Sequence, residues 1–267
     1  MIVRWARCII LWLALIPSAF ADYTLNMHRG VTPVSARVYD LHMTILWICV
    51  VIGIVVYSIM LYAIIRHRKS RGYAAASFHE STTVEIVWSI IPFIILFAMA
   101  VPATKTLIYM DNVDESDITI KITGHRWYWQ YDYLDDNFNF YSYLSTPEEQ
   151  IKNLAPKGKY YLLEVDRPVV LPIHKKIRFL ITSSDVLHSW WVPQLSVKKD
   201  AIPGFINEVW TKIEKPGVYR GQCAELCGTR HGFMPIVVEA KTQADYDIWL
   251  KSQKEKITSQ THDMTKT

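Results

Sequence analysis

Cysteine is scarce in this chain of 267 residues. There are four, of which Cys8 and Cys49 lie in strongly apolar segments near the N-terminus, so only Cys223 and Cys227 remain for the rest of the chain. At most one disulfide can therefore form there, and a disulfide between these two residues is the simplest structural interpretation. The C-x-x-C-H motif that attaches haem covalently is absent. The sequence also has no internal repeat and no low-complexity segment.

Excess charge is also small. The net charge is +4, and residues 107–240 carry 15 basic and 17 acidic side chains. The surplus of positive charge therefore lies outside this region, in a short basic loop and in the C-terminal tail. Nucleic-acid binding is not indicated, and a slightly acidic surface favours a basic protein partner.

Hydrophobic residues make up 51% of the sequence and concentrate in three N-terminal runs. The first run, residues 1–21, carries Arg4 and Arg7, then an apolar stretch, then Ala19-Phe20-Ala21. This pattern is typical of a secretory signal with an A-x-A cleavage site, so we expect the mature chain to begin near Asp22. An uncleaved membrane anchor is the alternative.

The second and third runs predict a transmembrane hairpin after an exported segment, residues 22–40. Residues 41–65 carry no formal charge and are long enough to cross a bilayer. Residues 86–104 are also uncharged, and we expect a helix over 86–106 in which a membrane tolerates Pro92. The loop between them, 66–85, opens with the basic cluster 66–71, which places it in the cytoplasm or its mitochondrial equivalent. Both ends of the mature chain then face outward.

Residues 107–240 predict an all-β domain. Short runs rich in β-branched and aromatic residues alternate with turn formers, which favours a sandwich or a Greek-key barrel. A polar linker, 111–117, precedes them, and the region 241–267 reads as a short helix, 243–256, and a polar tail. The predicted strands are 118–123, 127–133, 160–165, 176–182, 208–213, 217–222 and 235–240.

Two thiols, an imidazole and a thioether lie within the segment CAELCGTRHGFM, residues 223–234. A second imidazole, His188, precedes it in an apolar segment. Sulfur and nitrogen ligands of this kind favour copper over magnesium or calcium. Two cysteines at this spacing could bridge a pair of coppers, an arrangement that suits electron transfer better than catalysis.

Three long motifs carry a family resemblance. The segments GHRWYWQYDY, SSDVLHSWWVPQLSVKKDAIPG and GQCAELCGTRHGFMPIVVE closely resemble subunit II of haem-copper cytochrome c oxidase in order and spacing. The resemblance runs from the first membrane helix to about Ala240. It implies an all-β cupredoxin-like Greek-key barrel preceded by a two-helix transmembrane hairpin. It also implies the electron-transfer function of that subunit and a dinuclear copper centre, CuA.

The resemblance implies that six residues surround this copper centre: His188, Cys223, Glu225, Cys227, His231 and Met234. The two cysteines would bridge both coppers. His188 and Met234 would complete one copper, and His231 with the main-chain carbonyl of Glu225 the other. The Glu225 carboxylate would face a magnesium ion shared with subunit I, because a carboxylate is a hard ligand.

Further roles follow from the same resemblance. Trp127 corresponds to the residue through which electrons enter from cytochrome c, and Glu85 to a glutamate at the mouth of a proton channel. Arg126 departs from the glutamine expected beside the tryptophan. Subunits I and III, cytochrome c and the membrane are the implied partners, with the copper domain in the periplasm or the intermembrane space. The expected docking acids are Asp132, Asp135, Asp136, Asp166 and Asp185.

Two other functions remain open at this point. A membrane-tethered copper-delivery chaperone also carries C-x₃-C and a distant histidine, but it would resemble thioredoxin, and its histidine would follow the cysteines. A quinol-oxidising form of the same subunit would lack the copper ligands.

Overall fold

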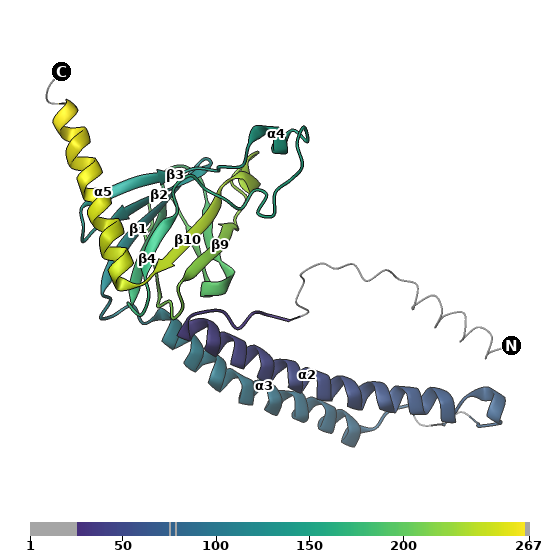
Figure 1. Cartoon of the computed structure of the whole chain (residues 1–267). Helices are drawn as coiled ribbons and strands as arrows, with labels where there is room; N and C mark the ends of the chain where they lie inside the picture. The colour runs from purple at the N-terminus through teal and green to yellow at the C-terminus, as the bar shows by residue number, and fades with distance from the viewer. Residues whose placement is uncertain (1–25, 75, 78, 265–267) are drawn as a thin grey trace.

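The computed structural model describes residues 26–264 except 75 and 78, with side chains as far as Lys256. The predicted signal, 1–21, lies outside the described residues. Two long helices form a hairpin, and a β-domain stands on the end of the hairpin where α2 starts and α3 ends (Figure 1).

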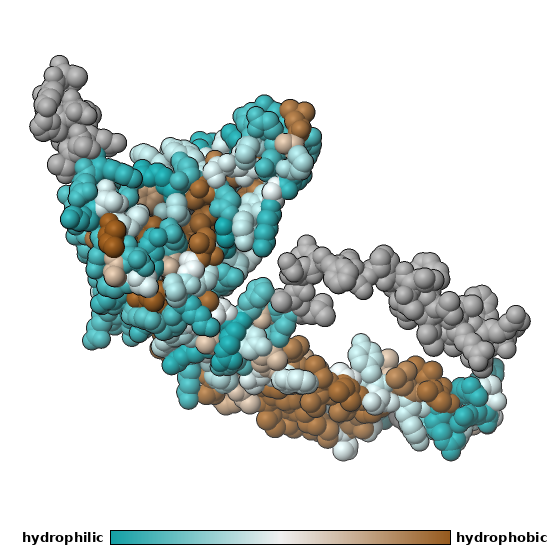
Figure 2. All heavy atoms as spheres, in the orientation of Figure 1, coloured by the Kyte–Doolittle hydropathy of each residue, from teal (hydrophilic) through white to brown (hydrophobic). Residues whose placement is uncertain are grey.

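The hairpin consists of α2 (Pro33–Arg66) and α3 (Thr82–Asp111), with a short 3₁₀ helix, η1 (Lys69–Arg71), in the basic loop. Thr32 caps α2 by accepting a hydrogen bond from the Ser35 main-chain N–H at 3.0 Å. Both helices are long and apolar enough to cross a membrane. Their apolar side chains form the broad hydrophobic surface of the hairpin (Figure 2), as expected for helices that face lipid.

The β-domain contains two five-stranded sheets, with strand orders β3-β2-β1-β5-β8 and β4-β10-β9-β6-β7. Pairs β1–β5 and β4–β10 are parallel, and the other neighbours are antiparallel. The strands are β1 (Ile118–His125), β2 (Tyr128–Tyr133), β3 (Phe138–Ser142), β4 (Val169–Pro172), β5 (Ile177–Ser183), β6 (His188–Val192), β7 (Val197–Ala201), β8 (Asn207–Thr211), β9 (Gly217–Cys223) and β10 (Pro235–Lys241).

Alternating side chains build the core between the sheets. In β5, Ile177, Phe179 and Ile181 are buried, and the residues between them are half-exposed. This period of two directs one face of a strand inward. Large aromatic side chains fill the space between the sheets, and the Trp190 indole N–H donates to the Tyr131 hydroxyl at 3.2 Å.

Short elements complete the domain: α4 (Glu148–Ile151), η2 (Pro193–Leu195), η3 (His231–Phe233) and the C-terminal α5 (Gln243–Met264). Helix α5 packs Trp249 against Tyr133 and Phe138, with ring centroids 5.5 and 5.8 Å apart. It extends past residue 256, where the sequence predicted its end, because neither proline nor glycine interrupts the segment that follows.

One predicted strand is wrong. Residues 160–165 form turns with a single bridge at Val165. Leu162 has a φ of 58°, which an extended strand cannot accommodate. Four observed strands, β3, β4, β6 and β7, were not predicted. They are four or five residues long, and β4 is buried at every position, so it has no alternating pattern to detect.

The hairpin and the β-domain are joined by polar contacts. The Val31 N–H donates to the Gln194 carbonyl at 3.0 Å, and the Thr32 hydroxyl donates to the Leu195 carbonyl at 3.1 Å. On the other helix, the Trp210 indole N–H donates to the Tyr109 carbonyl at 3.3 Å. These bonds fix the β-domain against the end of the hairpin.

The hydroxyl of Tyr133 ties the two sheets together, because it donates to the Val170 carbonyl at 2.8 Å and accepts from the Val170 N–H at 3.0 Å. Tyr133→Phe leaves both main-chain groups unpaired and is expected to lower the free energy of unfolding by about 1–3 kcal/mol. Urea denaturation of the full chain in detergent, followed by tryptophan fluorescence, measures the change. Tyr141→Phe is the control, since that side chain is 44% exposed. Equal midpoints for the two variants would contradict the role of Tyr133.

Candidate metal centre

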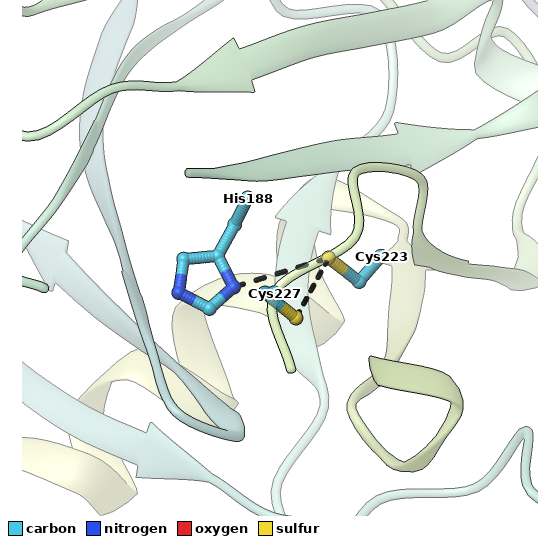
Figure 3. Close-up of side chains that lie close together, drawn as sticks. All are labelled: His188, Cys223 and Cys227. Atoms are coloured by element: carbon cyan, nitrogen blue, oxygen red, sulfur yellow. Dashed lines mark hydrogen bonds between the residues drawn. The ribbon is translucent and has the colours of Figure 1, made fainter. Parts of the chain in front are cut away.

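Three buried side chains converge at one end of the β-domain. Ligand atoms of His188, Cys223 and Cys227 all lie within 4.8 Å of one another (Figure 3). His188 opens β6 and Cys223 ends β9, and the two strands pair at Trp190 and Cys223. Cys227 lies in the loop after β9. Pairing of β6 with β9 therefore brings together residues that are far apart in the sequence.

The two sulfur atoms are the centre of the cluster. They are free thiols with Sγ atoms 3.9 Å apart, and the Nδ1 of His188 is 3.9 Å from the Cys223 sulfur. The Cys227 sulfur lies 3.5 Å from both the Nδ1 of His231 and the Sδ of Met234.

The main-chain carbonyl of Glu225 is 3.3 Å from the Cys223 sulfur. All six residues that the sequence suggested for a copper centre thus lie around the two thiols. The donor set is two thiols, two imidazoles, a thioether and a carbonyl, which fits copper better than a hard cation.

Burial sets the protonation of this cluster. Burial, together with the neighbouring Cys223, raises the pKa of the Cys227 thiol to about 12. The thiol therefore keeps its proton until a cation displaces it. Burial also lowers the pKa of His188, against the opposing effect of Asp185. The imidazole is then neutral near pH 7, which is the form that binds metals.

Asp185 orients His188. Its carboxylate lies 2.9 Å from the His188 Nε2, and it accepts main-chain N–H bonds from Val186 at 2.6 Å and Arg126 at 2.8 Å. Burial raises the pKa of Asp185, but these hydrogen bonds outweigh burial and the pKa is lowered. Holding Nε2 in this way turns Nδ1 toward Cys223, an arrangement common behind metal-binding histidines. The sequence analysis missed this role, although the Asp-x-x-His spacing is a usable signal.

Two neighbours shape the space around the ligands. A Cβ added at Gly124 would lie 2.9 Å from the Cδ2 of His188, so only glycine lets the imidazole sit against β1. Trp129, the partner of Gly124 in the β1–β2 register, donates its indole N–H to the Met234 carbonyl at 3.3 Å. Neither contact was anticipated from the sequence, although both residues belong to the motif GHRWYWQYDY.

Trp127 connects the cluster to the surface. Its indole N–H donates to the Cys227 carbonyl at 3.2 Å. The side chain is half-buried, and it follows Arg126, whose side chain is 53% exposed and lies 3.6 Å from the Asp185 carboxylate. Trp127 thus lies between solvent and the main chain of Cys227.

The expected docking acids are spread out. Asp135 accepts from the Thr119 N–H at 2.7 Å and Asp136 pairs with Lys254, so both lie at the far end of β1 from Gly124. Asp166 accepts from the Tyr143 N–H at 2.7 Å, and the Tyr143 ring packs 4.7 Å from that of Tyr128, next to Trp127. Asp132 lies in β2 between the Asp135–Asp136 end and the Trp127 end, opposite Lys121 in the β1–β2 register. Asp185 contacts Arg126 and His188.

Glu85 lies far from the thiols, in the first turn of α3 at the other end of the hairpin. Its side chain is exposed, and its carbonyl accepts from the Ser89 hydroxyl at 2.8 Å. At a rise of about 1.5 Å per residue, roughly 40 Å of helix separates it from the β-domain.

Two family descriptions match the chain. "Cytochrome C oxidase subunit II, periplasmic domain" matches residues 118–241, and "Cytochrome C oxidase subunit II, transmembrane domain" matches residues 21–106. The described β-domain has two sheets without alternating helices, so it does not have the thioredoxin-like fold expected of the chaperone alternative.

Similar proteins belong to the same family. The chain is 42% identical over 223 residues to the probable cytochrome c oxidase subunit 2 of Rickettsia felis, covering 83% of this chain and 69% of that protein. It is 39% identical over 260 residues to cytochrome c oxidase subunit 2 of Zea mays, covering 95% and 98%. A solved periplasmic domain of subunit II of cytochrome oxidase from Bradyrhizobium japonicum is 40% identical, covers 54% of this chain and 98% of that chain, and has a TM-score of 0.49.

With both family regions matched in order, two membrane-spanning helices and a sulfur-rich cluster in the periplasmic domain, the chain belongs to the cytochrome c oxidase subunit II family.

Proposed function

We propose that this subunit receives electrons from cytochrome c at a dinuclear copper centre, CuA, and passes them toward the haem of subunit I, where oxygen is reduced to water and protons are pumped. The observation that carries the proposal is the buried cluster of His188, Cys223 and Cys227, with His231 and Met234 against the second thiol. When bound, the copper pair supplies one-electron redox chemistry. The chain's own residues bind it, hold it rigidly and exclude water. Subunits I and III are the proposed neighbours in the membrane.

We assign the ligands as follows. Cys223 and Cys227 would hold both metals through their thiolates, His188 and Met234 would serve one metal, and His231 with the Glu225 carbonyl would serve the other. The Glu225 carboxylate, half-exposed here, is proposed to hold magnesium at the boundary with subunit I.

The surroundings support a rigid site. Cys223 and His188 belong to paired strands, and Met234 directly precedes β10. The His188 imidazole donates to the Asp185 carboxylate and the Trp129 indole donates to the Met234 carbonyl, and these hydrogen bonds fix two of the ligand residues. Ligands held in this way move little when the charge of the site changes, which favours rapid electron transfer.

Copper loading tests the ligand assignment. The full chain in detergent is expected to bind two copper ions, with hyperfine structure from two equivalent coppers in its electron paramagnetic resonance spectrum. His188→Ala or Cys223→Ser removes a buried ligand and should abolish that signal and lower the copper content. Cys49→Ser and His174→Ala are matched controls, since both side chains are exposed and lie outside the cluster.

A wild-type chain that binds a single copper, or only zinc, would reject the dinuclear centre. Magnesium is measured in the same way on the assembled complex. Glu225→Gln should lower the magnesium content and leave copper unchanged, because the main-chain carbonyl is retained. An unchanged magnesium content would reject the assignment of the Glu225 carboxylate as a magnesium ligand.

We further propose that cytochrome c docks beside Trp127. The half-buried indole donates to the Cys227 carbonyl, which supports a route for electrons from a docked partner through Trp127 to the cluster. Asp132, Asp135, Asp136, Asp166 and Asp185 are proposed to attract the lysine-rich partner. Their spread along β2 and the adjoining loops suits long-range steering better than a single tight contact.

Rapid-mixing reduction of the assembled oxidase by subsaturating cytochrome c tests docking and electron entrance together. The rate should fall steeply as salt rises, because screening limits exposed charges to about 8 Å at physiological ionic strength. Trp127→Phe should slow reduction about tenfold or more at every salt concentration while keeping the copper signal. Trp249→Phe, on α5, is the control. A salt-independent rate would reject the docking role of the five aspartates. A wild-type rate for Trp127→Phe would reject electron entry through Trp127.

Glu85 is proposed to help admit protons to a channel in subunit I. Its place in the first turn of α3, on the side of the hairpin that carries the basic loop, fits that position. Glu85→Ala in the assembled oxidase should slow turnover, and Glu80→Ala, in the preceding loop, is the control. If Glu85→Ala leaves turnover and haem reduction unchanged, Glu85 is only an interfacial residue.

A further inference from the structure

A pocket of about 560 Å³ lies where α3 meets the β-domain, on the side of the molecule away from the thiol cluster. Three lysines, Lys105, Lys176 and Lys212, line it together with Tyr109, Asn112 and Trp210. Among the residues with a described structure, no carboxylate lines this pocket. The pocket is therefore positively charged and has one aromatic wall.

The lysine charges are not neutralised by ion pairs. Among the residues that the structure describes, no salt bridge involves Lys105, Lys176 or Lys212. Lys176 donates to neutral acceptors, the Asn112 amide oxygen at 3.2 Å and the Asp114 main-chain carbonyl. The Asp117 carboxylate accepts a main-chain N–H bond from Lys176 and is paired with Lys175 rather than with a lysine of the pocket.

The aromatic wall adds a further cation. The rings of Tyr109 and Trp210 pack edge to face at 5.3 Å. The Arg37 guanidinium from α2 lies 3.6 Å from the centre of the Tyr109 ring, and the Lys176 ammonium lies 4.9 Å from that of Trp210. Four cations thus gather around two amphipathic rings. This composition is typical of the membrane–water boundary, where tyrosine and tryptophan concentrate.

The depth of the pocket agrees with that boundary. Lys105 directly follows the uncharged run 86–104 of α3, and Ile108, three residues nearer the β-domain, also lines the pocket and is 65% exposed. Figure 2 shows the hydrophobic surface of the hairpin giving way to hydrophilic residues at this junction. A lysine at this height extends its charge toward the headgroups and keeps its methylenes in the apolar layer.

We infer that this pocket binds the phosphate of an anionic phospholipid headgroup from the outer leaflet. Lys105, Lys176 and Lys212 contact the phosphate, Asn112 and Trp210 border the headgroup, and the acyl chains lie along the exposed apolar side of α3 near Ile108. Basic clusters next to membrane helices recognise anionic lipids through this chemistry. Lys176 directly precedes β5 and Lys212 directly follows β8. The bound lipid therefore links α3 to both strands.

The test uses the assembled oxidase in a mild detergent, with bound lipid counted by native mass spectrometry as phosphatidylglycerol or phosphatidylcholine is added. Wild-type complex is expected to retain phosphatidylglycerol in preference to phosphatidylcholine. Lys105→Gln/Lys212→Gln should weaken phosphatidylglycerol binding roughly tenfold to thirtyfold, since each lysine near a membrane surface contributes about a factor of five. Lys157→Gln/Lys251→Gln removes the same charge outside the pocket and should have no effect.

Three outcomes decide the inference. The inference is overturned if the pocket variant and the wild type bind phosphatidylglycerol equally. It is also overturned if inorganic phosphate at equal concentration displaces the lipid, because the pocket would then be a site for a soluble anion. Recovery of binding in Lys105→Arg/Lys212→Arg supports it. The haem spectrum confirms assembly of each variant. Should the double variant fail to assemble, Lys105→Gln alone repeats the test with a single exposed side chain. None of these readouts depends on copper.

Discussion

Two thiols held 3.9 Å apart inside a β-domain are the interaction on which the rest of the structure depends. Like-charged thiolates at that distance repel each other, and burial together with the neighbouring Cys223 raises the pKa of Cys227. The site is therefore unfavourable for anions until cations enter. The β6–β9 pairing, which places His188 beside Cys223, keeps the thiols together despite this cost. The fold supplies the geometry, and the metal supplies the compensating charge.

A hydrogen-bonded chain extends from this centre to the surface. His188 contacts Asp185, and Asp185 accepts from the main chain of Arg126, the residue before Trp127. Trp127 returns to the cluster through the Cys227 carbonyl. Each thiol is thus connected to the same surface segment by a different route. The Arg126 guanidinium pairs with the Asp185 carboxylate, so its charge is partly compensated within the chain.

Sequence alone predicted the parts of the structure that have a strong pattern. The long uncharged runs predicted the hairpin, and the resemblance of the three motifs to a known family implied the four residues that now lie beside Cys223 and Cys227. It did not predict β4, which is buried throughout, and it was wrong for 160–165, where Leu162 takes a left-handed conformation. The role of Gly124 depends on a contact with His188, which is distant in sequence, and no local pattern encodes it. Asp185 is only three residues from His188, so the local Asp-x-x-His spacing could have indicated its role.

Position above the membrane is the last constraint. Helix α3 runs into β1 with only a short polar segment between them, and Trp210 of β8 bonds back to the last turns of that helix. Val31 and Thr32, which precede α2, bond to the Gln194–Leu195 turn that follows β6, the strand that begins with His188. The start of α2 is thus bonded to the sheet that carries the ligands, and α3 is bonded to the other sheet. These bonds hold the thiols at one height and orientation over the bilayer. An electron relay between a soluble donor and a membrane-embedded acceptor requires that fixed position.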